Sequence, residues 1–371
     1  MFSAKQKAQA ILSKAGITPN GPNDWDPQVH NEKLYTRVLM GGSLALGDSY
    51  VEGWWDVKSL DQFFYKLLTV ELQHDFNFTF PVLFSAARSW LFNLQSVSRA
   101  FQVGQHHYDI GNDVYKAMLD PRMVYSCGYW AHARNLAEAQ EAKLDLICRK
   151  IGLKKGGRIL DIGCGWGGLL KFAAEKYGVS GVGITVSKEQ KKLAEEVCQG
   201  LPVEIILEDY RKLTGQFDHI VSVGMFEHVG AKNYKVFFTK ARQLLKDNGL
   251  FLLHTIGWNS KGGSIDPWIE KYIFPNGMLP SISQIGKSIE SVFVMEDWHN
   301  FGSDYDKTLM AWFNNFDKNW SSLEEKYSER FYKMWKYYLL NCAGGFRARN
   351  IQLWQVVLSK KGVKEGYQSV R

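Results

Sequence analysis

The residues most suited to chemistry form a glycine-rich turn near the middle of the chain. An apolar run typical of a buried strand leads into Asp161, and Gly163, Gly165 and Gly167 follow it. Glycine allows positive φ angles and lets a ligand approach the main chain closely. The helical pattern that comes next would offer unpaired N–H groups at its start. The sequence therefore predicts a strand, a turn and a helix that together bind a nucleotide.

The order of the acid and the glycines distinguishes this turn from a dinucleotide site. Asp161 stands before the first glycine, whereas the dinucleotide fingerprint is Gly-x-Gly-x-x-Gly. A carboxylate at a strand end suits a ligand that lacks a pyrophosphate and carries a positive charge. S-adenosylmethionine has both properties, so we expect the turn to bind it.

The second half of the chain alternates between the strand period and the helix period. Strands are expected at 158–162, 181–186, 203–207, 219–223, 250–255, 291–295 and 351–359. Helices are expected at 168–176, 188–198, 232–246, 305–317 and 323–340. This alternation predicts an α/β fold with a mostly parallel sheet and helices on both of its faces.

Ligands of such sheets bind beyond the carboxyl ends of the strands. Functional side chains should therefore follow strands directly. The polar residues that satisfy this rule are Asp161, Thr185, Asp209, Glu227 and His254.

Two of these strand ends are candidates for the nucleoside part of the ligand. Asp209 and Tyr210 could bind adenine through its amino group and by stacking, or they could form a surface turn. Gln190 follows Thr185 by about one helical turn and could hydrogen-bond the ribose hydroxyls.

Two others are candidates for catalysis. Glu227 is bracketed by apolar residues, and a buried carboxylate needs a partner because burying it alone is costly. His254 ends an apolar strand, where a histidine can be either a satisfied core residue or a functional one. Tyr305 shares helical spacing with Trp312 and Phe316, which is typical of core packing, although its place at the helix start would bring it nearer a pocket.

The five cysteines are scattered, and none pairs with metal-ligand spacing, so we expect no metal site and a reducing compartment. Cys127 lies in a loop between Pro121 and Trp130 that could fold over the cofactor. As a nucleophile it would need a nearby base or a lowered pKa, and otherwise it is a small buried hydrophobe. Cys342 faces the same choice, whereas Cys148 has core spacing.

Composition and charge place the protein among soluble or membrane-surface proteins. Its 371 residues suffice for two domains, and 14% of them are aromatic. The net charge is +7, and residues 321–371 hold ten basic and four acidic residues, nearly the whole excess. An anionic membrane surface or a solvated helix face explains this segment, and no nucleic-acid motif is present. No signal peptide or long apolar span is visible, so we expect a cytosolic or peripheral protein.

The first part of the chain differs from the rest. Residues 1–100 have mainly helical patterns, with a break at Gly41 and Gly42 and a less regular stretch at 71–81. We therefore expect a smaller helical domain over residues 1–100 and a catalytic domain over residues 101–371.

A set of motifs spread over essentially the whole chain resembles the bacterial cyclopropane-fatty-acyl-phospholipid synthases. The motifs are GSLALGDSYVEGWW, HYDIGNDVY, MVYSCGYW, LDIGCGWGG, VGITVSKEQ, VSVGMFEHVG, LLHTIG, KYIFPNG, MEDWHNFGSDYDKTLMAW and CAGGFRARNIQLWQ. The related mycolic-acid cyclopropane synthases lack the long N-terminal region, so its presence favours the phospholipid branch.

The resemblance implies a Rossmann-like class I methyltransferase domain with a seven-stranded sheet. It also implies which residues bind S-adenosylmethionine. These residues are Tyr125, Ser126, Ile159, Leu160, Asp161, Ile162, Gly163, Cys164, Gly165, Trp166, Gly167, Thr185, Val186, Ser187, Lys188, Glu189, Gln190, Asp209 and Tyr210. It further implies a bicarbonate held by Cys127, Glu227, His254, Tyr305 and the carbonyl of Ile256, and a catalytic role for Cys342.

The reaction implied by the resemblance adds a methylene group to the cis double bond of a phospholipid acyl chain and leaves S-adenosylhomocysteine (SAH). Because the alkene itself attacks the methyl group, the chemistry requires no covalent enzyme intermediate, which argues against a cysteine nucleophile. The expected partners are the inner face of the membrane and a second copy of the chain, joined through the N-terminal domain. The alternatives are a relative that adds a methyl branch to a lipid alkene and an amine methyltransferase of the same fold. A protein that binds S-adenosylmethionine at a membrane without catalysis is a third alternative.

Overall fold

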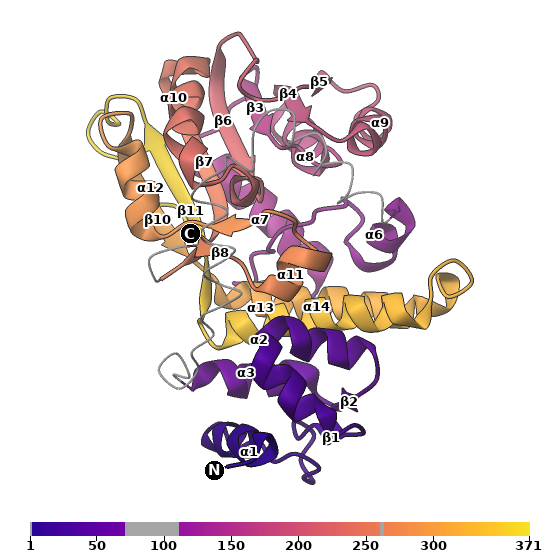
Figure 1. Ribbon diagram of the computed structural model, residues 1–371. Coiled ribbons are helices and arrows are strands. Elements are labelled where there is room, and N and C mark those ends of the chain that lie inside the picture. The colour runs from indigo at the N-terminus through magenta and orange to yellow at the C-terminus, as the bar shows by residue number, and fades with distance from the viewer. Residues whose placement is uncertain (1, 71–110, 260–262) are drawn as a thin grey trace. The chain divides into compact units, whose positions relative to one another are not determined.

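The computed structural model describes residues 2–70, 111–259 and 263–371 (Figure 1). These residues fall into two compact units. The first unit contains residues 2–70, Ser264–Pro275 and Tyr305–Ile351, and the second contains the remaining described residues. This grouping differs from the contiguous division expected at residue 100, because two later segments join the N-terminal helices. The expected boundary itself, and the stretch 71–81, lie outside the described residues.

The second unit contains a seven-stranded sheet with the order β10-β11-β7-β6-β3-β4-β5. Strands β3 to β7 pair in parallel, and β10 pairs with β11 in antiparallel fashion. The strands are β3 (Arg158–Ile162), β4 (Ser180–Thr185), β5 (Val203–Leu207), β6 (Phe217–Val223), β7 (Leu245–Trp258), β10 (Val294–Asn300) and β11 (Ile351–Ser359). The mostly parallel sheet predicted from the alternating pattern is thereby confirmed.

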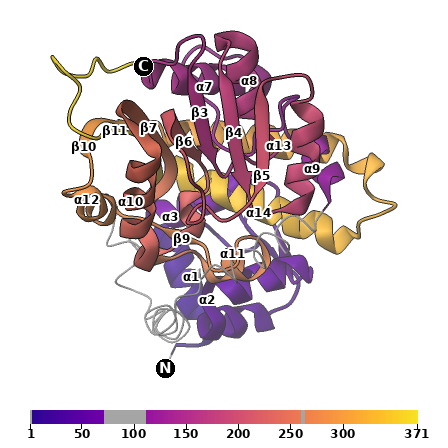
Figure 2. The ribbon, with the colours of Figure 1, turned by 90° about the horizontal axis from the view of Figure 1, so that it is seen from above.

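Both faces of the sheet are covered, which explains why its central strands are largely apolar. Along β3, Leu160 and Ile162 join one hydrophobic cluster and Ile159 joins the other, as the two-residue period of a strand requires. Helices α10 and α12 contribute to the first cluster, and α7 and α8 contribute to the second (Figure 2). The helices of this unit are α6 (Asn112–Met118), α7 (Leu136–Lys150), α8 (Gly168–Tyr177), α9 (Lys188–Val197), α10 (Tyr234–Leu244) and α12 (Ile282–Ile289).

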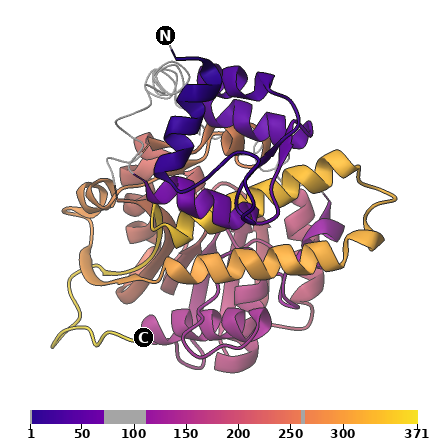
Figure 3. The ribbon, with the colours of Figure 1, turned by 90° about the horizontal axis from the view of Figure 1, so that it is seen from below.

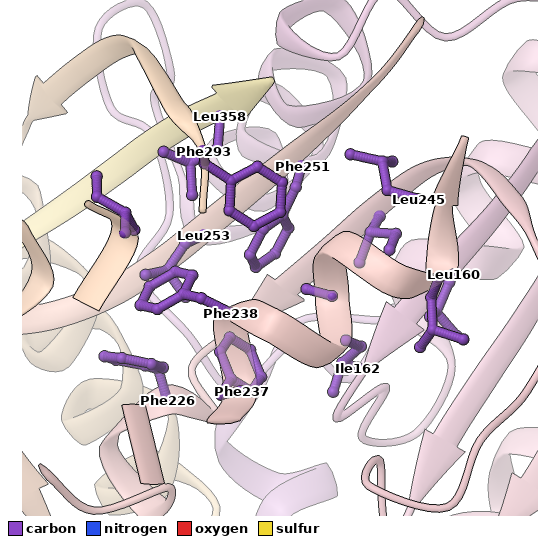
Figure 4. Close-up of a cluster of buried hydrophobic side chains, with 14 of the residues drawn as sticks. Leu160, Ile162, Phe226, Phe237, Phe238, Leu245, Phe251, Leu253, Phe293 and Leu358 are labelled. Atoms are coloured by element: carbon purple, nitrogen blue, oxygen red, sulfur yellow. The ribbon is translucent and has the colours of Figure 1, made fainter. Parts of the chain in front are cut away.

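The cluster under α10 is rich in phenylalanine (Figure 4). Phe237 and Phe238 project from α10, and their rings lie 6.0 and 6.2 Å from that of Phe251 on β7. Phe226 lies 5.2 Å from Phe237 and continues this packing to the carboxyl end of β6. These contacts anchor the segment that follows β6, which carries Glu227.

The first unit is mainly helical (Figure 3). Its elements are α1 (Ala4–Lys14), β1 (Gln28–Val29), α2 (Lys33–Val51), β2 (Trp55–Asp56), α3 (Leu60–Thr69), α11 (Pro267–Tyr272), α13 (Ser303–Lys318, from Tyr305 onward) and α14 (Glu329–Arg347). Helix α14 packs closely on α3, where a Cβ at Gly344 would lie 2.6 Å from that of Phe64. Arg347 binds both Asp61 on α3 and Asp306 on α13, at 2.7 and 2.9 Å. The remaining short strands are β8 (Gly263–Ser264) and β9 (Met278–Leu279), and β9 belongs to the second unit.

Most expected elements are confirmed, and two of them are wrongly placed along the chain. The strand expected at 291–295 begins at Val294 and runs to Asn300, because Val292 and Phe293 instead turn into the core after α12. The helix expected at 323–340 begins only after Ser328, whose side chain caps it, and continues to Arg347. Helices α6, α7, α11 and α12 were not among the expected helices. The expected break at Gly42 appears as a kink in α2, where its φ is 59°.

In the part of the chain that the structure describes, no helix combines the length and the apolar character that crossing a membrane requires.

Replacing Phe238 with alanine tests the cluster under α10. The ring is fully buried, so its removal should lower the free energy of unfolding by about 3–5 kcal/mol. Val236→Ala on the same helix is the matched control, because Val236 is 49% exposed and should cost far less. Urea unfolding followed by circular dichroism measures both. Equal losses in the two variants would contradict this description of the core.

Candidate active site

The glycine turn between β3 and α8 has the backbone conformation that its sequence predicts. Gly163, Gly165 and Gly167 have φ angles of 89°, 53° and 82°, which favour glycine. A Cβ at Gly163 would lie 2.6 Å from the side chain of Met225, whereas one at Gly165 would meet nothing within 4 Å. The turn is therefore packed tightly on the side of Met225 and open at Gly165, where a ligand could approach the backbone.

Asp161, at the end of β3, is nearly completely buried, and its Oδ1 has no hydrogen-bond partner among the described residues. Burial raises the pKa of this carboxyl group to about 7, and the nearby Lys143 opposes the rise. A cationic ligand such as S-adenosylmethionine would place a positive charge beside this carboxyl group. Asp161 therefore fits the cofactor that the turn predicts.

An aromatic wall adjoins the turn. Trp166, within the turn, donates from Nε1 to Asn112 Oδ1 at 3.1 Å. The ring of Tyr115 lies 4.9 Å from that of Trp166 and 5.2 Å from that of Tyr125. Helix α6 thus connects the turn to the loop that carries Tyr125. Asn112 and Tyr115 were not predicted to have a role, although both belong to the HYDIGNDVY motif.

The residues after β4 hydrogen-bond to one another. Thr185 donates from Oγ1 to Gln190 Oε1 at 2.7 Å, and Ser187 caps helix α9 by accepting from the Gln190 backbone N–H. These three side chains are buried, whereas those of Lys188 and Glu189 are exposed. The structure therefore brings Thr185 and Gln190 together, and the role of Gln190 in binding the ribose stays a prediction.

Asp209, after β5, forms a buried ion pair that the sequence did not indicate. Arg211 Nη2 and Nε lie 2.6 and 2.7 Å from its two carboxylate oxygens. The ring of Tyr210 meets that of Phe237 edge to face at 5.3 Å. The role of Asp209 and Tyr210 in adenine binding stays a prediction, and any amino group that binds Asp209 would share it with Arg211.

Glu227 belongs to a short 3₁₀ helix, Phe226–His228, that follows β6. Its Oε1 accepts a hydrogen bond of 2.7 Å from the Ile256 backbone N–H, whereas no described residue binds its buried Oε2. Burial raises the pKa of the Glu227 carboxyl group to about 7. The group can therefore exchange a proton near neutral pH.

His254 lies on β7, where it pairs with Val223 of β6. Gln355 Nε2 lies 3.2 Å from Nδ1 and donates to it as the amide is oriented, so the ring proton resides on Nε2. That Nε2 is buried and has no partner in the described part of the chain. Burial lowers the pKa of His254 well below its usual value, with Lys143 and Lys150 adding to the effect. His254 thus presents a neutral N–H donor.

Cys127 is fully buried, and its thiol donates to the Gly128 carbonyl at 3.2 Å. Helix α7 supports the loop around it, because Gln140 Nε2 donates to the Ser126 carbonyl at 2.7 Å and Lys143 Nζ donates to Ser126 Oγ at 2.6 Å. Gln140, Lys143 and Gln355 were not predicted from the sequence. A polar residue on the inner face of a helix or central strand is the signal that could have revealed them.

Tyr305 and Cys342 belong to the first unit, so their place in the site stays a prediction. The Tyr305 ring lies 4.5 Å from that of Phe346. Asp304, the preceding residue, accepts a hydrogen bond of 2.7 Å from the Trp130 backbone. Burial raises the pKa of the Cys342 thiol to about 12, which disfavours its thiolate. All five cysteines are free.

The family model described as mycolic acid cyclopropane synthetase matches residues 95–356. The chain belongs to this family. It is 55% identical to the cyclopropane-fatty-acyl-phospholipid synthase of Escherichia coli over 98% of this chain and 95% of that protein. A probable fatty acid methyltransferase of Pseudomonas putida is 38% identical over 69% of this chain and 68% of its own length.

A solved mycolic acid cyclopropane synthase, in complex with SAH and CTAB, has the same fold as most of this chain. It superposes with a TM-score of 0.66 at 34% identity and covers 70% of this chain and 98% of its own. The predicted class I methyltransferase fold is thereby confirmed.

Replacing Glu227 with glutamine tests whether burial raises the pKa of the Glu227 carboxyl group. The folded pKa is raised above the unfolded value, so the stability contributed by protonation is present below about pH 4.5 and is lost as the pH rises through 7. Without ligands, Glu227→Gln should exceed the wild type in free energy of unfolding by about 1–3 kcal/mol at pH 8. The difference should shrink toward pH 5. Urea unfolding at both pH values measures it, and a difference independent of pH would contradict the raised pKa.

Proposed function

We propose that this protein transfers a methylene group from S-adenosylmethionine to the cis double bond of unsaturated phospholipid acyl chains, forming a cyclopropane ring and SAH. The observation that carries this proposal is the 55% identity to the Escherichia coli synthase over 98% of the chain. The mycolic acid synthase covers only 70% of this chain. The long N-terminal region thus supports a phospholipid rather than a mycolic acid as substrate.

The residues at the glycine turn suit S-adenosylmethionine. When bound, this cofactor supplies an electrophilic methyl group. Asp161 would face its positive charge with the unpartnered Oδ1, and the open backbone at Gly165 would admit it. The Tyr125 and Trp166 rings would line the adjoining wall through their contacts with Tyr115.

The protein must overcome the weak nucleophilicity of an isolated alkene. Alignment of the reacting atoms can contribute roughly 7–11 kcal/mol. After the alkene attacks, positive charge develops on the acyl chain, and a proton must leave the added methyl group before the ring closes. Aromatic faces can stabilise such a cation without being alkylated as readily as an amine. The remaining requirement is a base that stays ionised beside an apolar chain.

The unpartnered Glu227 Oε2 and His254 Nε2 fit a small anion, bicarbonate, as the source of this base. His254 would donate its N–H, and Glu227, whose pKa is raised to about 7, can share a proton with the anion instead of repelling it. By resemblance, Cys127, the Ile256 carbonyl and Tyr305 would complete the set. Bicarbonate held there would supply the base in a pocket with little water.

Neither cysteine suits nucleophilic catalysis. The Cys127 thiol donates its proton to a backbone carbonyl, and the raised pKa of Cys342 keeps that thiol protonated. We therefore assign Cys127 to the anion set and no chemical step to Cys342. Because the alkene attacks the methyl group directly, the reaction also needs no covalent enzyme intermediate.

The second candidate is a methyltransferase that leaves a methyl branch on a lipid alkene. The probable fatty acid methyltransferase of Pseudomonas putida, at 38% identity, favours it over an amine methyltransferase. It shares the first step with the synthase and differs in the fate of the proton on the added methyl group.

We further propose that the protein works as a peripheral enzyme on the cytoplasmic face of the membrane and dimerises through its N-terminal helices. The basic excess in residues 321–371 supports attraction to anionic headgroups. A peripheral position also suits a reaction whose double bonds lie within the hydrocarbon core of a bilayer.

The mass of the acyl chains tests the proposed reaction. The protein is incubated with S-adenosylmethionine and vesicles of mono-unsaturated phospholipid, and the released chains are analysed by mass spectrometry and proton NMR. We expect a gain of one CH₂ with loss of the alkene signal and appearance of cyclopropane protons. A retained alkene or a methyl branch would overturn the proposal in favour of the second candidate.

Vesicle composition tests the membrane proposal in the same system. Sedimentation with vesicles should increase with the fraction of anionic lipid and fall as salt is raised, because surface charges are screened. Binding that is equal on neutral and anionic vesicles at every salt concentration would exclude the electrostatic part. Equilibrium sedimentation of the protein alone measures its mass in solution, which distinguishes a monomer from a dimer.

Substitutions in the anion set separate turnover from cofactor binding. Glu227→Gln and Tyr305→Phe should lower kcat by about 10²-fold or more while leaving the affinity for SAH within about threefold. Cys342→Ser is the contrasting variant and should retain most of its activity. Full activity in either of the first two variants, or complete loss in Cys342→Ser with SAH binding intact, would contradict these assignments.

A further inference from the structure

Helix α7 carries a lysine whose ammonium group is enclosed within the second unit. The Lys143 side chain is 0% exposed, although lysine is rarely buried without a specific partner. Its Nζ lies 2.6 Å from Ser126 Oγ, and the acidic groups around it are Asp120, Asp161 and Cys127. These groups include residues predicted to bind the cofactor and residues predicted to bind the anion.

The hydrogen bond fixes the role of the Ser126 hydroxyl. An ammonium group has no lone pair, so Lys143 must donate and Ser126 Oγ must accept. The serine proton is then directed to another acceptor. Gln140, one turn before Lys143, binds the Ser126 carbonyl at 2.7 Å and holds the main chain of the loop. Together the two α7 side chains set both the position and the donor direction of Ser126.

Two carboxyl groups lie near the charge of Lys143, and they differ in their hydrogen-bond partners. Asp120 already accepts backbone hydrogen bonds of 2.9 Å from Arg122 and Val124. Asp161 keeps a buried oxygen that no described residue binds. The positive charge therefore matters most to Asp161, which it favours in the ionised form.

We propose that Lys143 is a positioning residue for the cofactor. It directs the Ser126 hydroxyl as a donor toward S-adenosylmethionine, and it places a positive charge near Asp161, the carboxyl group that would face the cationic part. This inference rests on the proposed use of that cofactor. It accounts for a buried ammonium group that the methyl-transfer chemistry does not otherwise require.

The same helix provides a matched control. Lys150 is also 0% exposed, and its Nζ lies 3.0 Å from His299 Nδ1 and 3.5 Å from Asp297 Oδ2. Both partners are on β10 and neither is a predicted cofactor residue. Replacing Lys150 with methionine therefore reproduces the loss of a buried lysine from α7 without removing a contact to Ser126.

The experiment compares Lys143→Met, Lys150→Met, Ser126→Ala and the double variant Lys143→Met/Ser126→Ala in the full-length protein. Calorimetry measures SAH binding, thermal unfolding reports the fold, and steady-state kinetics give KM for S-adenosylmethionine and kcat. Lys143→Met should weaken SAH binding by about tenfold or more, and KM should rise by a larger factor than kcat falls. Lys150→Met should bind SAH within about threefold of the wild type.

The double variant shows whether Lys143 acts through Ser126. If it does, Ser126→Ala should weaken SAH binding much less in the Lys143→Met background than in the wild type. Unchanged SAH affinity in Lys143→Met, or equal weakening in Lys150→Met, would overturn the inference. If Lys143→Met does not fold, Ser126→Ala alone decides, because unchanged affinity in that variant would also overturn it. Wild-type protein that binds SAH without forming cyclopropane would refute the proposed function and leave this inference standing.

Discussion

The chemistry of this protein depends on the cost of enclosing polar groups without partners. Asp161, Glu227 and His254 are all buried at the carboxyl edge of one sheet, and each keeps an atom that no described residue binds. Such atoms cost free energy unless a ligand satisfies them. The shifted pKa values of these groups express the same cost, since burial is the first cause in all three. The site therefore offers unpartnered atoms that a bound ligand can satisfy.

The fold brings these groups together because parallel strands end at the same edge. Asp161 follows β3, Glu227 follows β6, and His254 lies on β7, so residues far apart in the sequence meet in three neighbouring strands. The phenylalanine cluster under α10 anchors the segment with Glu227. On the other face, α7 supports the loop with Ser126 and Cys127. Each functional segment thus rests on packed secondary structure and not on loop structure alone.

The sequence predicted what local patterns encode, namely the parallel sheet, the glycine turn and the polar strand ends. It failed where tertiary packing decides. Helix α14 continues through Gly344 because the missing side chain lets α3 approach, whereas a glycine pair normally indicates a helix end. The bounds of β10 could not be predicted from local patterns, because its polar residues form an antiparallel edge strand. Lys143 and Gln355 could not be predicted, because no local sequence pattern shows that a lysine or a glutamine will be buried beside the site.

We propose above that the unpartnered Glu227 Oε2 and His254 Nε2 bind a small anion. Carbon-13 NMR of the protein equilibrated with ¹³C-bicarbonate measures this directly. We expect a bound resonance, distinct from free bicarbonate, in the wild type and its loss or marked weakening in Glu227→Gln. The absence of a bound resonance in the wild type, or an identical one in both proteins, would contradict it.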